Sequence, residues 1–408
     1  MKSNNIKKDY LWNMIGSVCY SASSFYYLML VTRICGVTDG GIFALAFATA
    51  QLLLTFGRYG MRTYQATDVK TNYTFTEYGG SRIITCVGMV IFAWIYSVAA
   101  GYSLYKIQIF VWVTALKMID AVEDVFHGEL QRRHQVALMG KMLAARNLFS
   151  CVVFGAVIIV SRDLKITCIV TVVLSLIFAL VINRSAVFHT CGKQKGLRIQ
   201  SLGKLFVICF PIFISTFLSL YLYNIPKYAI DRYMTEDIQT YYSILFMPSF
   251  IITLFSEIIT KPVLTDISVS WEKDGEAFSK SVRRIYLLIA GGTVAVVLGG
   301  HFIGRWILEI FYGVSLEKYK THFIILLLGG GISAAVYISY NILIAIRFEK
   351  SIIVVYLAAA AVATPATYFL VRKMGMMGAA WSYLVTCLLL EIIFGSILLW
   401  KIKEKKHG

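Results

Sequence analysis

Long apolar runs follow one another along almost the whole chain, and the polar stretches between them are mostly short. A helix needs about 20 apolar residues to cross the hydrocarbon core of a bilayer. Because the runs are continuous rather than alternating, the pattern predicts membrane helices and not the strands of an outer-membrane barrel. Twelve spans are expected, at residues 11–34, 38–57, 82–101, 106–128, 142–161, 166–187, 202–223, 239–261, 284–304, 322–346, 351–371 and 376–400.

The composition agrees with a chain that lies mainly in lipid. Hydrophobic residues make up 58% of the 408 positions, and the mean hydropathy is +0.71, far above that of a soluble domain. The first apolar run is too long for the core of a cleavable signal, so none is expected. With no soluble domain predicted for chemistry, the pattern favours a protein that moves a substrate across a membrane.

The formal net charge of +17 follows the membrane topology rather than indicating a nucleic-acid partner. With the N-terminus placed in the cytoplasm, the inside segments hold twenty-seven Lys and Arg residues and the outside segments ten. Such an excess on one side is the positive-inside pattern. It predicts twelve crossings with both termini cytoplasmic, because removing one helix would reverse the side of every later loop.

Neither a metal site nor a catalytic constellation is visible in the sequence. The eight cysteines are scattered singly and form no C-x-x-C pair, which argues against a metal or redox centre. A Walker A motif is absent, so we expect no ATP hydrolysis by this chain. The chain is therefore expected not to be an enzyme and to hold no cofactor. Coupling to a proton or sodium gradient remains open.

The longest polar stretch near the middle, at 188–204, comes after six of the twelve spans. Two halves of six helices are a common transporter plan. We therefore expect an N-terminal six-helix lobe at 1–190, a cytoplasmic linker at 191–204 and a C-terminal six-helix lobe at 205–408.

The span at 106–128 carries an unusual stripe of ionisable side chains. At 100° per residue, the stripe occupies one arc of about 120° opposite an apolar face, and its members are Lys117, Asp120, Glu123, Asp124 and His127. Charges at membrane depth are costly, so this arc is expected to face the bundle interior or a wet cavity. The alternative is a structural ion pair between Lys117 and Asp120, three residues apart, above an ordinary cluster at the inner interface.

Three arginines at helix ends are further candidates for contact with an anion. Arg58 and Arg62 stand one helical turn apart at the inner end of the second span. Arginine binds phosphate through bidentate, charge-assisted bonds, and either a substrate or lipid headgroups would satisfy such a pair. Arg33 closes the first span near the outer side, where it either snorkels or contributes to an anion-binding rim.

Other polar faces allow two interpretations each. In the first span, Gly16 and Tyr20 belong to a seam of small and polar residues that either packs on a neighbour or lines a water-filled path. In the tenth span, Tyr337, Tyr340 and Asn341 share a face suited to sugar rings. Glu257 and Glu391 are lone carboxylates in the eighth and twelfth spans, and a coupling ion or an interhelical bond would explain Glu391.

Several short strings carry a resemblance to a known family. They are TRICG at 32–36 leading into GIFALA at 41–46, EDVFHG at 123–128, NIPKYAID at 224–231 and GMMGAAW at 375–381. With twelve expected spans, the chain resembles, over essentially its whole length, the Wzx-like polysaccharide repeat-unit flippases of the multidrug/oligosaccharidyl-lipid/polysaccharide exporter superfamily. The resemblance implies an all-α fold with two lobes around a central cationic cavity. It also implies translocation of an undecaprenyl-diphosphate-linked oligosaccharide across a bacterial inner membrane by alternating access.

That function assigns roles to the candidate residues. The cationic positions expected to bind the diphosphate are Lys117, Arg33, Arg58, Arg62 and Lys227. Tyr337, Tyr340 and Asn341 are the expected sugar contacts, and the expected ion-coupling carboxylates are Asp120, Asp124 and Glu257. The expected partners are the lipid-linked oligosaccharide and membrane lipids, with glycan-assembly proteins as further candidates and nucleic acid excluded.

Three alternatives remain from the sequence. A drug/cation antiporter of the same superfamily would need an acidic cavity, against which the candidate cavity cations argue. A twelve-helix porter of the major facilitator type could use residues 57–62 as its loop between the second and third helices, but the expected Asp is missing there. A membrane-embedded enzyme of glycan assembly is the alternative from a different class.

Overall fold

The chain folds into long helices in the computed structural model, and the ranges that it describes contain no strand. It describes all residues except 1, 69–71, 192–197, 250–251, 253–255, 257–266, 268–270, 272–274, 347, 349 and 408. The first seven helices are α1 (Lys2–Ile34), α2 (Val37–Arg58), α3 (Met61–Thr67), α4 (Phe75–Ala99), α5 (Leu104–Arg132), α6 (Val136–Ser161) and α7 (Leu164–Cys191).

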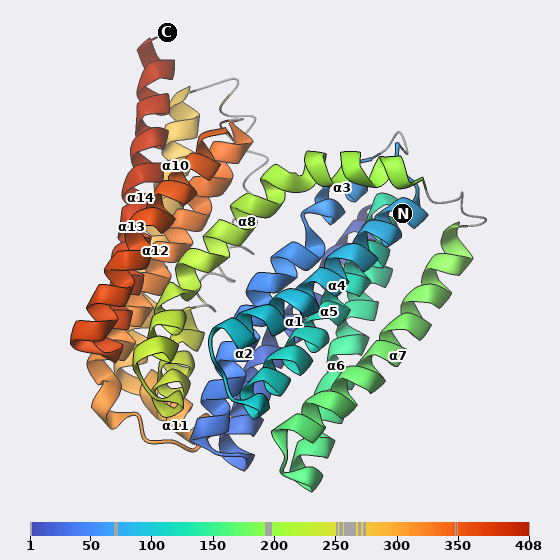
Figure 1. Cartoon of the computed structure of the whole chain (residues 1–408). Helices are drawn as coiled ribbons and strands as arrows, with labels where there is room; N and C mark the ends of the chain where they lie inside the picture. Colours follow the sequence, from blue (N-terminus) through green and yellow to red (C-terminus); the bar gives the residue numbers. More distant parts are fainter. Residues whose placement is uncertain are drawn as a thin grey trace. The chain divides into compact units, whose positions relative to one another are not determined.

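The second part of the chain begins with α8 (Ile199–Tyr233), after which residues 236–249 are also helical. There follow α10 (Gly275–Gly299), a π-helical turn (Gly300–Gly304), α11 (Arg305–Tyr312) and a short 3-10 turn (Glu317–Tyr319). The chain ends in α12 (Lys320–Ala345), α13 (Lys350–Met374) and α14 (Met376–His407) (Figure 1).

The helices confirm the membrane fold predicted from the apolar runs. Among the described residues, ten helices are long and apolar enough to cross a bilayer. Helix α5 is equally long but carries more charge, and the described residues of the predicted eighth span, 239–249, 252 and 256, are helical. In its described residues, each of the twelve predicted spans therefore coincides with a helix, although the helices commonly extend beyond the apolar run. The chain is an all-α, multi-pass membrane protein.

The chain divides into two compact units, Met1–Phe217 and Leu218–Gly408, and the division falls within α8. Residues 199–204, part of the predicted linker 191–204, form the first turns of that helix. The lobe boundaries at 190 and 205 stay a prediction.

In the first unit, α5 lies at the centre and packs on α2, α4 and α7, while α1 packs on α6. The contact between α1 and α6 is close because both helices present a glycine. A Cβ at Gly16 would lie 2.6 Å from the carbonyl oxygen of Gly140, and a Cβ at Gly140 would lie 2.3 Å from that of Trp12. At Gly16, the small and polar seam of the first span therefore serves helix packing, one of the two interpretations that the sequence allowed.

Local sequence signals set the helix boundaries around this centre. Helix α2 ends where Tyr59 and Gly60 adopt positive φ angles of 50° and 66°, and the chain then resumes as the short helix α3. Helix α4 begins several residues before its apolar run because Thr74 caps it. The Thr74 hydroxyl accepts from the backbone N–H of Glu77, whose carboxylate accepts from the N–H of Thr74 at 2.8 Å.

In the second unit, α12 packs on α10 and α14, and α13 packs on α14. Glycines again allow close approach, since a Cβ at Gly330 would lie 2.7 Å from the Cα of Ser249. Helix α8 continues to Tyr233, well beyond the predicted span 202–223. Lys227 therefore lies within a helix.

Candidate functional site

The ionisable stripe of α5 is buried inside the first unit and makes ion pairs with four neighbouring segments of the chain. Lys117 Nζ lies 3.0 Å from Asp120 Oδ2, and both side chains are at most 5% exposed. The ion pair that the sequence spacing suggested is therefore present. The carboxylates of the stripe also form ion pairs with cations on other helices.

Arg146 of α6 lies against the middle of the stripe. Its guanidinium pairs with Asp120 through Nη2 and with Glu123 Oε2 through Nε at 2.8 Å. The other oxygen of Glu123 accepts from the amide of Asn183 on α7, at 3.1 Å. Arg146, Glu123 and Asn183 are at most 3% exposed, so a charged network joins α5, α6 and α7 without solvent.

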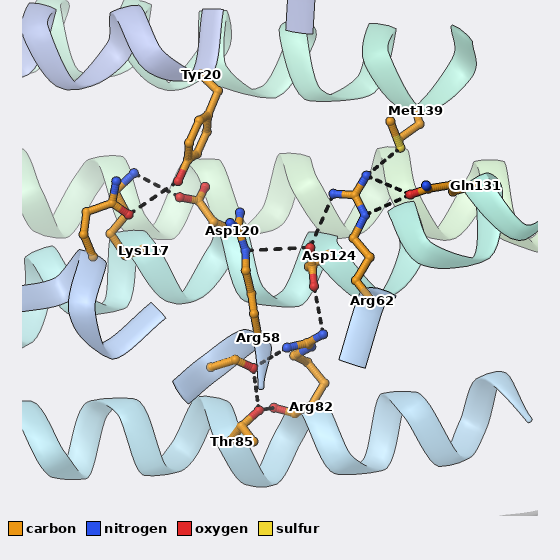
Figure 2. A network of polar contacts seen from close by, with 12 residues as sticks. Tyr20, Arg58, Arg62, Arg82, Thr85, Lys117, Asp120, Asp124, Gln131 and Met139 are labelled. Atoms are coloured by element: carbon orange, nitrogen blue, oxygen red, sulfur yellow. Dashed lines mark hydrogen bonds and ion pairs between the residues drawn. The ribbon is translucent and has the colours of Figure 1, made fainter. Parts of the chain in front are cut away.

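Three guanidinium groups surround the carboxylate of Asp124, one turn further along the stripe (Figure 2). Arg82 of α4 donates from Nη2 to Oδ2 at 3.0 Å. Arg62 Nη1 and Arg58 Nε lie 3.5 Å and 3.7 Å from Oδ1. The Arg82 side chain is 3% exposed, whereas those of Arg58 and Arg62 are 39% and 32% exposed. One carboxylate thus holds one buried and two accessible arginines.

Aromatic rings lie against the cations at the other end of the stripe. Lys117 Nζ lies 4.7 Å from the ring centroid of Tyr20 on α1 and 4.5 Å from that of Phe47 on α2. The Arg58 guanidinium also lies 5.9 Å from the Tyr20 ring. A ring face attracts a cation within about 6 Å, so Tyr20 lies beside two of the candidate anion-binding side chains.

The network as a whole carries excess positive charge. The network contains three carboxylates and two more Lys or Arg side chains than that. These cations are Arg58, Arg62, Arg82, Lys117 and Arg146. His127, the last member of the stripe, is buried, and its Nε2 has no hydrogen-bond partner among the residues described. Excess cations at membrane depth are expensive unless an anion accompanies them.

The C-terminal end of α5, beyond the predicted span, has its own charge cluster. Glu129 lies 2.7 Å from Arg132 and 2.8 Å from Arg133. Burial acts to raise the pKa of Glu129, but hydrogen bonds from the two arginines outweigh it and hold the pKa below its ordinary value. Glu129 therefore remains a carboxylate that anchors both arginines at the end of the helix.

The other predicted site residues lie away from this network. Arg33 is exposed at the far end of α1, thirteen residues from Tyr20, which is about 20 Å along a helix. In the second unit, Lys227 is half-buried on α8 with its Nζ 4.6 Å from the ring centroid of Phe246. The predicted sugar contacts Tyr337, Tyr340 and Asn341 are half-buried on α12, and Glu257 lies outside the described residues.

Comparison with known proteins places the chain in a family. A family model described as polysaccharide biosynthesis protein matches residues 30–319. The chain belongs to this polysaccharide biosynthesis protein family. A search of curated proteins finds no match.

Solved structures share the fold of this polysaccharide biosynthesis protein. An inward-facing multidrug resistance MATE transporter of the MOP superfamily has a TM-score of 0.73 at 11% identity, covering 96% of each chain. The lipid II flippase MurJ, in an inward closed conformation, also has a TM-score of 0.73, at 13% identity, covering 96% of this chain and 87% of its own. A Vibrio cholerae MATE transporter has a TM-score of 0.65 at 12% identity, with 99% and 97% covered. At these identities the likeness establishes the fold alone.

Sequence reasoning missed the two cations that complete the network of this family member. Arg82 and Arg146 are not among the site residues predicted from the sequence, yet both are buried within helices, at 2% and 3% exposure. A signal was available: both arginines lie within the predicted apolar spans, where a charge requires a partner. The sequence could not show that the carboxylates of α5 are those partners.

Proposed function

We propose that this protein carries an undecaprenyl-diphosphate-linked oligosaccharide from the inner to the outer leaflet of a bacterial cytoplasmic membrane by alternating access, with both termini in the cytoplasm. Membership of the polysaccharide biosynthesis protein family and the MOP transporter fold support a flippase. The observation that carries the proposal is the excess of cations around Asp120, Glu123 and Asp124.

Arg58 and Arg62 are the side chains through which this excess would act on a substrate. Both lie near Asp124 but at distances longer than a good charge-assisted bond, and about a third of each side chain is exposed. Their guanidinium groups can therefore turn to a diphosphate without leaving Asp124 unpaired, because Arg82 still holds it. Lys117 adds a further positive charge one to two turns deeper.

The second unit supplies a cation of a different kind. Lys227 lies in a candidate membrane span, and within the described ranges it has no carboxylate partner. A membrane-embedded lysine without a counter-charge is expensive to maintain and fits a site that an anionic substrate visits. Tyr337, Tyr340 and Asn341 on α12 are proposed to contact the sugars of that substrate. Arg33, exposed at the outer end of α1, is proposed to meet the diphosphate at that side.

Transport against a gradient would need an energy source other than ATP. Asp120, Asp124 and Glu257 are proposed to couple transport to protons or sodium. No cofactor enters the proposal. Membrane lipids surround the protein, and glycan-assembly proteins are proposed as further partners.

The proposal is tested with purified protein in vesicles that contain a fluorescent undecaprenyl-diphosphate oligosaccharide. Lipid exposed in the outer leaflet is bleached by a reagent that does not cross the membrane, so translocation appears as an increase in the bleached fraction. We expect translocation by the wild type and a loss of at least about tenfold, equal to 1.4 kcal/mol, in Lys227→Met.

The matched control is Lys141→Met. Lys141 is exposed on α6 and also lies over an aromatic ring, that of Trp12, at 5.1 Å. This control is expected to translocate at the wild-type rate. A wild-type protein that leaves the lipid in its original leaflet would overturn the proposed function.

A drug/cation antiporter is the second candidate, because MATE transporters share the fold. The positive excess in the first unit opposes binding of a cationic drug, since like charges in a low-dielectric site repel strongly. Uptake of a cationic dye by the same vesicles, in place of the lipid, would favour this candidate.

A further inference from the structure

Glu391, a carboxylate in the second unit, has hydroxyl groups as partners, whereas the carboxylates of the charged network in the first unit pair with cations. Glu391 lies in the middle of α14, half-buried. It accepts from the hydroxyl of Tyr286 on α10 at 2.8 Å, and Ser339 Oγ on α12 lies 3.0 Å and 3.1 Å from its two oxygens. Tyr286 and Ser339 also contact each other through their hydroxyl oxygens. Three helices therefore meet in one ring of oxygens.

With Glu391 ionised, this ring has more contacts between oxygens than it has protons to form hydrogen bonds. The Tyr286 and Ser339 hydroxyls contribute one proton each, and a carboxylate only accepts. Three pairs of groups are in contact, so an ionised Glu391 would leave one close oxygen pair without a proton. A protonated Glu391 closes the ring: its O–H donates to Ser339 Oγ, Ser339 donates to Tyr286, and Tyr286 donates to the other oxygen of Glu391.

The electrostatic surroundings agree with a neutral Glu391. No Lys or Arg in the described part of the chain forms an ion pair with it, in contrast to Asp120, Glu123 and Asp124. Among the described residues, the ionisable groups found near Glu391 are Tyr286 on α10 and Tyr223 on α8. Around Tyr223 lie further tyrosines and a thiol, which are Tyr356 on α13 and Tyr383 and Cys387 on α14. An isolated carboxylate in a bilayer without a cation is costly.

We propose that Glu391, Tyr286 and Ser339 form a proton-binding site within the second unit. Loss of the proton breaks the ring and leaves an uncompensated charge among α10, α12 and α14, so these helices must rearrange or admit water. Binding and release of one proton would thus be linked to the packing of this unit. That the proton drives lipid transport rests on the proposed function, whereas the existence of the site does not.

Infrared difference spectroscopy of the purified protein tests the site. A protonated carboxyl has a carbonyl band that a carboxylate lacks, and 13C-labelled glutamate identifies the band by its shift. At neutral pH the wild type is expected to show one such band that Glu391→Gln removes. Tyr286→Phe should shift it, because the carbonyl loses its donor.

Glu404→Gln is the matched control, because Glu404 lies on the same helix but pairs with Lys401 at 2.7 Å. It should leave the band unchanged. The amide that E391Q introduces can replace both bonds of the protonated carboxyl, so this variant is expected to fold, and Y286F provides the test if it does not. Absence of the band, its survival in E391Q, or its loss when sodium chloride replaces potassium chloride would overturn the proposal, the last by indicating a sodium site.

Vesicles with an imposed pH gradient separate this site from the proposed function. If the wild type translocates the lipid and responds to the gradient, E391Q is expected to lose that response, whereas E404Q retains it. An unchanged response in E391Q would contradict coupling through this site. If the wild type shows the infrared band but moves no lipid, the proton site stands and the proposed function fails.

Discussion

Arg82 of α4 binds Asp124 of α5 at 3.0 Å, and both side chains are 3% exposed. The same guanidinium donates to the backbone carbonyl of Gly57 near the end of α2, to which Thr85 also donates at 2.8 Å. Arg82 therefore joins the carboxylate to the end of a neighbouring helix. Arg58 and Arg62 also pair with Asp124, but at longer nitrogen–oxygen distances than Arg82 does (Figure 2).

Replacing Arg82 should destabilise the first unit strongly. Arg82→Ala leaves the buried side of Asp124 unpaired, and breaking a buried ion pair costs about 3–5 kcal/mol. Thermal unfolding in detergent measures the effect. Arg198→Ala is the control: Arg198 pairs with Glu77 but is 66% exposed, so its loss should cost at most about 1 kcal/mol. Equal losses in the two variants would show that Asp124 does not depend on Arg82.

Arg58 and Arg62 should affect binding more than stability. Because both are partly exposed and their pairs with Asp124 are long, Arg58→Ala and Arg62→Ala should each change the free energy of unfolding by about 1 kcal/mol or less. Binding of undecaprenyl diphosphate to the purified protein should weaken by about tenfold or more in each. Lys141→Ala should leave binding unchanged. Unaltered binding in both arginine variants would exclude them from the diphosphate site.

Lys117→Ala should abolish transport while leaving the protein inserted in the membrane. Asp120 retains Arg146 in this variant, so the carboxylate keeps a counter-charge. Complementation of a flippase-deficient strain measures function, and the amount of protein in the membrane fraction measures insertion. Normal surface polysaccharide with Lys117→Ala would remove this lysine from the transport pathway.

Gly140 should be sensitive to a single methyl group. In Gly140→Ala the new Cβ would lie 2.3 Å and 2.6 Å from backbone atoms of Trp12 and Asn13, so α1 and α6 must separate, at a cost of about 1–3 kcal/mol. Gly291→Ala is the control, since its Cβ meets nothing within 4 Å and alanine favours a helix. The melting temperature should fall in the first variant and hold or rise in the second. A wild-type melting temperature for Gly140→Ala would refute the close packing.

The sequence by itself determined the class of the protein and the position of its helices. Apolar runs of spanning length leave the backbone no alternative to a helix, because lipid offers no hydrogen bonds. The ionisable stripe on α5 could be predicted to face protein or a wet cavity rather than lipid, because charges at membrane depth are costly. Helix ends were less predictable: α4 starts early through the Thr74 cap, and α8 runs past its apolar stretch to Tyr233.

Only the tertiary structure decided which side chains meet. The 3.6-residue period places Lys117, Asp120 and Asp124 on one face, but it carries no information about the neighbouring helix. Arg82 and Arg146 reach those carboxylates, and Tyr286 and Ser339 reach Glu391, through helix packing that small residues such as Gly16 and Gly140 permit. A charge in an apolar run indicates from the sequence that a partner is needed. Which side chain that partner is depends on how the helices pack.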